Sequence, residues 1–205
     1  MSLTSTKLTI SSGRTWADLV GCVASLVDAS ACLTLLFLPS TPANADRLCI
    51  TLVDPITCII VYWALYQRLN DARPIWAELG FYLLISGTLF LTCRNVLQES
   101  ASLNLPTLNY STANDFDFVL EPLVTFTLPF GLAIYAWLIA SSPPLRRWLG
   151  FMMGVQVVLL LIAFSSFAFP LLSDSASSEL CAVYAIILSV SKAVWFLSPV
   201  ARLKS

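Results

Sequence analysis

The chain has 205 residues, of which 58% are hydrophobic and 11% are charged, and its formal net charge is −1. A soluble domain needs about a quarter of its residues charged to cover its surface. The composition therefore predicts a membrane protein whose apolar surface faces lipid. The small net charge, without any long basic run, excludes nucleic acid as a partner.

Metal and cofactor chemistry is not expected from the residue inventory. The sequence contains no histidine, which is the commonest general base and the commonest transition-metal ligand. Its six cysteines show no short paired spacing of the kind found in zinc sites and redox CxxC motifs. We read them as small packing residues, and expect no metal and no cofactor.

The chain begins with a Ser- and Thr-rich segment, residues 1–15, which we expect in the cytosol. No alanine-type cleavage site follows the apolar run that starts at Trp16, so this run is predicted to be an uncleaved first membrane helix. Six apolar windows are long enough to span about 30 Å of hydrocarbon at 1.5 Å per residue. They cover residues 16–38, 48–67, 74–93, 118–140, 148–172 and 180–199, which form a single membrane domain followed by a short cytosolic tail, 200–205.

These windows are apolar on every face, which favours helices over the alternating strands of a barrel. The predicted fold class is therefore all-α, a polytopic bundle of six transmembrane helices. The longest predicted link, residues 94–117, contains Asn109-Tyr110-Ser111, an acceptor pattern for N-glycosylation. Basic residues accumulate on cytoplasmic loops, and their positions put both termini in the cytosol. The predicted cytoplasmic segments contain Lys7, Arg14, Arg68, Arg73, Arg146, Arg147, Arg202 and Lys204, against Arg47 and Arg94 on the other side.

Charged residues inside membrane helices are costly and usually paired, so they are functional candidates. In the first helix a small and acidic face is formed by residues three and four apart. On this face Asp28 either borders a polar cavity, where it would act as an acid, or forms a hydrogen bond across a packing seam. The residues of the face are Asp18, Gly21, Cys22, Ser25, Asp28, Ala29 and Cys32.

Three further charged residues, Lys192, Glu78 and Asp54, extend this set of candidates. Lys192 shares an inward face with Trp195 and lies at a depth similar to Asp18 and Glu78, so we expect an ion pair with one of these acids. The alternative is that its long side chain reaches the cytoplasmic surface. Asp54 precedes Pro55, which frees a carbonyl one turn back, and this arrangement indicates part of a binding pocket.

Acids and aromatic residues without metal ligands indicate an acid-initiated cyclisation or isomerisation of an apolar, isoprenoid-type substrate, in which aromatic faces stabilise the carbocation. The analogy is with small membrane terpene cyclases and rests on chemistry alone. Two alternatives stay open: a non-catalytic membrane subunit or assembly factor, and a small cation or proton transporter or channel. The expected partners are membrane lipid, an apolar small molecule and other membrane proteins, in an endomembrane or plasma membrane. The candidate residues are Asp28, Asp54 and Glu78 for catalysis and Tyr82, Gln156 and Trp195 for substrate binding.

Overall fold

The computed structural model describes residues 16–37, 45–70, 73–102, 110–141, 147–165 and 174–197. Over these ranges the chain is all-helical, which confirms the predicted fold class in its coarse form. The six helices are α1 (Trp16–Phe37), α2 (Ala45–Leu69), α3 (Pro74–Ser102), α4 (Tyr110–Ala140), α5 (Arg147–Ser165) and α6 (Asp174–Leu197).

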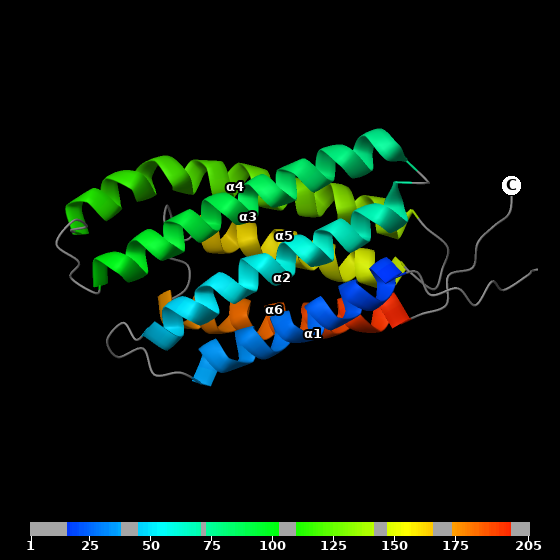
Figure 1. Cartoon of the computed structure of the whole chain (residues 1–205). Coiled ribbons are helices and arrows are strands. Elements are labelled where there is room, and N and C mark those ends of the chain that lie inside the picture. Colours follow the sequence, from blue (N-terminus) through cyan, green and yellow to red (C-terminus); the bar gives the residue numbers. More distant parts are fainter. Residues whose placement is uncertain are drawn as a thin grey trace, which may run out of the picture.

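The helices form an up-and-down bundle that closes on itself. Each helix packs against the next one in the chain, and α1 also packs against α6. Figure 1 shows the helices running along one common direction, with the start of α1 and the end of α6 at the same end of the bundle. We call this the basic end, because Arg68, Arg73 and Arg147 lie there at the ends of α2, α3 and α5.

Glycines allow close helix contacts, among them three between α3 and α4. A Cβ atom on Gly131 would lie 2.8 Å from Leu84 Cγ and 2.9 Å from Leu84 N, and one on Gly87 would lie 2.9 Å from the backbone nitrogen of Leu128. Such contacts leave no room for a side chain. Helices within a bilayer commonly associate through small residues in this way.

The outer surface is more apolar than that of a soluble protein, and the largely apolar core also contains polar and charged groups. Large apolar side chains cover the outside, including Phe126 and Phe151, which are 66% and 71% exposed. Polar side chains lie inside, and Asp18, Ser25, Asp28, Thr57, Ser189 and Lys192 are all buried. An apolar exterior that encloses buried polar and charged groups is what a lipid environment favours.

Within the described part of the chain, three segments are long and apolar enough to cross a membrane: Trp16–Thr34, Pro74–Gln98 and Asp115–Ala140. This composition is compatible with membrane insertion. The two shorter apolar helical segments are Arg147–Ile162 and Val183–Leu197.

The helix bounds differ from the predicted windows mainly at the end of α3 and the start of α4. The sequence placed a long link at residues 94–117, yet α3 continues to Ser102 and α4 already begins at Tyr110. The reason is that Arg94 donates hydrogen bonds to the Asp117 carboxylate, through Nε and, at 3.3 Å, through Nη2. The predicted apolar windows end next to these charged residues, while the helices continue through them. Asn109 lies outside the described residues.

Candidate functional site

The candidate site lies where α1, α2 and α6 meet. Gly21 on α1 permits this approach, because a Cβ atom there would be 2.7 Å from both Ala64 Cβ on α2 and Phe196 Cζ on α6. The inward face predicted for α1 is confirmed: Asp18, Ser25 and Asp28 are each at most 3% exposed. About two turns further along α1 than Gly21, the carboxyl group of Asp28 is directed into the three-helix junction.

The two oxygens of the Asp28 carboxylate face different partners. Oδ2 accepts a hydrogen bond from the Ser189 hydroxyl and lies 3.7 Å from Lys192 Nζ, both on α6. Oδ1 accepts hydrogen bonds from Cys58 Sγ at 3.6 Å and from Thr57 Oγ1 at 3.4 Å, both on α2. The Asp28 carboxylate therefore links all three helices.

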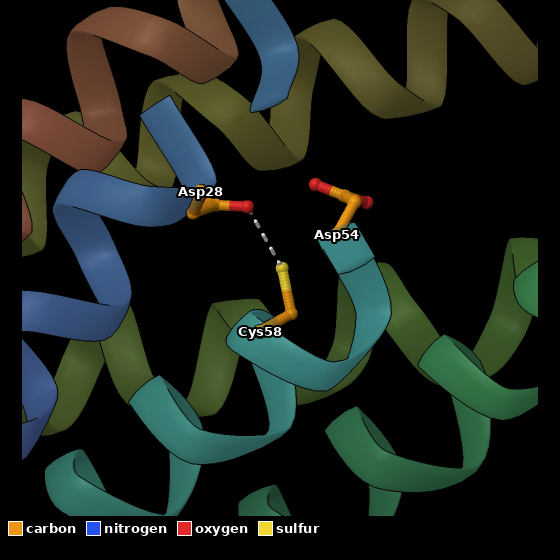
Figure 2. A group of neighbouring side chains, drawn as sticks. All are labelled: Asp28, Asp54 and Cys58. Atoms are coloured by element: carbon orange, nitrogen blue, oxygen red, sulfur yellow. Dashed lines mark hydrogen bonds between the residues drawn. The ribbon is translucent and has the colours of Figure 1, made fainter. Parts of the chain in front are cut away.

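A second acid, Asp54 on α2, faces Asp28 across the helix interface. Figure 2 shows the two carboxyl groups directed toward one another, with the Cys58 thiol pointing at Asp28. One ligand atom from each of Asp28, Asp54 and Cys58 lies within 4.8 Å of the other two. Cys32, one turn after Asp28, donates a hydrogen bond from Sγ to Asp54 Oδ1 at 3.7 Å.

The charges of this group do not balance when both acids are ionised. Asp28 and Asp54 supply two carboxylates, and Lys192 supplies one ammonium at 3.7 Å from Asp28. The side chains of Asp28 and Lys192 are only 4% and 5% exposed, so water contributes little to stabilising the remaining negative charge. The group therefore favours one additional cation, either a proton or a metal ion.

A separate cluster at the basic end is built around Arg68. Its Nε donates to Asp18, its Nη1 to the Trp195 carbonyl at 3.2 Å, and its Nη2 to the Phe196 carbonyl at 2.9 Å. The guanidinium carbon also lies 4.4 Å from the centre of the Trp195 ring. We call this the Arg68 clamp, because it ties α1, α2 and the last turn of α6 together.

The structure assigns ionic partners that differ from the two expected for Lys192. Lys192 lies against Asp28, while Asp18 contacts Arg68 and Glu78 is exposed on α3. A similar predicted depth in the membrane suggested Asp18 and Glu78 as partners of Lys192. Depth alone does not say toward which neighbouring helix a side chain points. Since α3 packs between α2 and α4, Glu78 is not positioned to meet a lysine that points into the junction of α1, α2 and α6.

The expected substrate-binding residues do not gather around Asp28. Tyr82 is 60% exposed on α3, and Trp195 is buried against Arg68. Gln156 lies on α5, and its buried Oε1 atom has no hydrogen-bond partner among the described residues. Of the three candidate catalytic acids, the structure brings together Asp28 and Asp54.

Sequence reasoning missed the α2 and α6 residues that complete the site: Thr57, Cys58 and Ser189. A signal for one of them was present. Asp28 and Cys32 are four residues apart on α1, and Asp54 and Cys58 have the same spacing on α2. This repeated Asp-x-x-x-Cys pattern places an acid and a thiol one turn apart on each helix.

Comparison with known protein families, characterised proteins and solved structures gives no match. The geometry of the site is therefore the basis of the proposed function.

Proposed function

We propose that the chain is an integral membrane protein with six membrane-spanning helices that moves a small cation across the bilayer, using Asp28 and Asp54 as its binding site. The observation that carries this proposal is the pairing of the buried Asp28 carboxylate with the half-buried Asp54 carboxylate, beside which the described residues supply only one ammonium. Charged side chains that face the interior of a membrane bundle commonly mark ion pathways. This is the transporter alternative derived from the sequence, now with a specific binding site.

The depth of the site supports a transport role. Asp28 lies about 18 Å from the start of α1, at 1.5 Å per residue, which is close to the middle of a hydrocarbon core about 30 Å thick. Ser25 and Asp18 lie on the same buried face of α1, between this site and the basic end. The close packing at Gly21 and the Arg68 clamp close the bundle on that side.

The six-span topology rests on the arrangement of all the helices. In addition to the three long apolar segments, α2, α5 and α6 direct large apolar side chains outward, among them Ile56, Phe151 and Val194. In the proposed topology the alternating helices would bring the basic end to one side of the bilayer, and the preference of basic residues for the cytoplasm supports a cytosolic location for that side. Both termini then lie in the cytosol.

Acid-initiated cyclisation has less support from this geometry. That chemistry needs aromatic faces around the acid to stabilise a carbocation. In the described structure Tyr82 and Glu78 are exposed on α3, and the Trp195 ring stacks on Arg68. A role as a non-catalytic subunit, in which the polar groups only lock the helices, becomes an outcome of the following test.

The test is cation flux in liposomes that contain the purified full-length protein. Uptake of H⁺, Na⁺, K⁺ and Zn²⁺ is measured under an imposed potential, for the wild type and for Asp28→Asn. We expect flux of one of these cations in the wild type and at least a tenfold loss in the variant. Glu78→Gln is the matched control, because it removes an exposed acid outside the site and should leave the flux unchanged.

Two results would overturn the proposal. Wild-type liposomes with no more flux than empty ones would favour the subunit role. An undiminished flux in Asp28→Asn would remove Asp28 from the pathway.

A further inference from the structure

We infer that the cation is a thiophilic divalent metal ion of the Zn²⁺ class, bound by Asp28 Oδ1, a carboxylate oxygen of Asp54 and Cys58 Sγ. This inference rests on the proposed function, since it names the ion for the same site. It also departs from the expectation that the chain has no metal site.

The spacing of the three ligand atoms fits a small tetrahedral ion. Zn²⁺ binds carboxylate oxygen at about 2.0–2.2 Å and thiolate sulfur at about 2.3 Å, so neighbouring ligand atoms in a tetrahedron lie about 3.3–3.7 Å apart. Asp28 Oδ1 and Cys58 Sγ are 3.6 Å apart, and all three ligand atoms lie within 4.8 Å of one another. A contraction of about 1.5 Å at most brings the set to tetrahedral spacing.

The charges accommodate a divalent ion once the Cys58 thiol is ionised, whereas a monovalent ion balances the same group with the thiol protonated, so the choice between them rests on the sulfur ligand. Two carboxylates, a Cys58 thiolate, the Lys192 ammonium and a divalent ion together carry no net charge, which is the least costly state in a low-dielectric interior. On binding, the metal–sulfur bond replaces the Cys58 S–H bond, and the released proton passes to solvent. The sulfur ligand favours Zn²⁺ over Mg²⁺ and Ca²⁺, which prefer oxygen ligands.

The neighbouring side chains hold the ligands in orientation. Ser189 and Lys192 engage Asp28 Oδ2, so that Oδ1 stays directed toward Cys58. The Cys32 thiol donates to Asp54 Oδ1. Metal-binding carboxylates are commonly oriented by such outer partners.

Three protein ligands leave the fourth tetrahedral position open to water. Structural zinc sites are usually closed by four protein ligands, whereas sites that exchange a ligand keep one position open. An open position suits an ion that must enter and leave.

The test measures metal binding by the full-length protein in detergent under reducing conditions. Zn²⁺ affinity is obtained by competition with a chromophoric chelator, and Co²⁺ serves as a spectroscopic probe, because a thiolate ligand produces a sulfur-to-cobalt charge-transfer band. We expect one ion per chain, together with that band. Cys58→Ser should abolish the band and weaken Zn²⁺ binding at least about tenfold, since loss of even an outer partner costs 10–100-fold.

The matched control is Cys22→Ser, which alters a buried cysteine on α1 outside the site and should preserve both signals. Protection of Cys58 from alkylation by Zn²⁺ in the wild type gives the same test without relying on the folding of a variant. Absence of Zn²⁺ binding, or binding that is unchanged in Cys58→Ser, would overturn the metal inference. If liposomes then still carry H⁺ or Na⁺ through Asp28, the proposed transport function stands. If no cation is carried, both proposals fail.

Discussion

Removing the single ammonium of the site should destabilise the protein more than removing one of the two acids. Lys192 Nζ and Asp28 Oδ2 are 3.7 Å apart, which corresponds to a Coulomb attraction of about 4.5 kcal/mol at an effective dielectric constant of 20. Lys192→Met leaves Asp28 and Asp54 facing each other without a counter-charge. We expect the free energy of unfolding to fall by about 3–5 kcal/mol, the usual cost of breaking a buried pair.

Asp28→Asn should lower the free energy of unfolding by less than Lys192→Met, because Lys192 and Asp54 remain and their charges balance. The main loss is the charged character of the hydrogen bonds at position 28, worth about 1.5–3 kcal/mol. In the double variant Lys192→Met/Asp28→Asn only one carboxylate remains. The two losses should therefore not add, and we expect a coupling free energy of about 2 kcal/mol or more.

The assay is reversible unfolding in mixed micelles, with a chelator present to remove metal ions. Lys192→Met combined with Glu78→Gln is the control pair and should be additive within about 0.5 kcal/mol, because Glu78 is exposed on α3. Additivity of the Lys192 and Asp28 variants would refute the pairing. A larger loss of unfolding free energy in Asp28→Asn than in Lys192→Met would refute the inference that the site has an excess of negative charge.

Three further predictions concern packing, the Arg68 clamp and topology. Gly131→Ala should lower the free energy of unfolding by about 1–3 kcal/mol through overpacking against α3. Gly154→Ala, where a Cβ meets nothing within 4 Å, should raise the free energy of unfolding by about 0.5–1 kcal/mol. Equal effects of Gly131→Ala and Gly154→Ala would contradict the close contact of Gly131 with α3. Arg68→Lys should cost about 2–3 kcal/mol in the same assay, because lysine cannot reproduce the planar fork of donors, and a silent substitution would count against the clamp. Single cysteines at the exposed positions Asp115 and Arg147 should label from opposite sides of the membrane, and labelling from one side would reject the six-span topology.

The number and order of the helices could be predicted because each apolar run is long and bounded by turn residues. The helix ends could not, as α3 and α4 show. The length of an apolar run reflects the preference of its side chains for lipid, and the apolar runs of α3 and α4 stop at Arg94 and Asp117. Helix formation depends instead on backbone hydrogen bonding, which continues through polar residues when their side chains pair as these two do.

The site was only partly predictable for a related reason. The spacing of small and polar residues three and four positions apart in α1 correctly placed Asp28 on an inward face. Which residues share a face of one helix can be read from the sequence of that helix alone. The identity of the partner of Asp28 was not encoded in this way. Lys192 lies 164 positions later in the chain, and only the packing of α6 against α1 decides that it meets Asp28.

The pairing of the first helix with the last has a consequence for biosynthesis. In the proposed topology, with the chain inserted helix by helix, Asp28 and Asp54 would enter the bilayer before their basic counterpart has been translated. At about 5–20 residues per second, Lys192 follows Asp54 after roughly 7–28 s. During this interval the nascent α1–α2 hairpin carries two acids without their ammonium. A fragment that ends before α6 retains this imbalance permanently, and we expect it to be retained by membrane quality control rather than assembled.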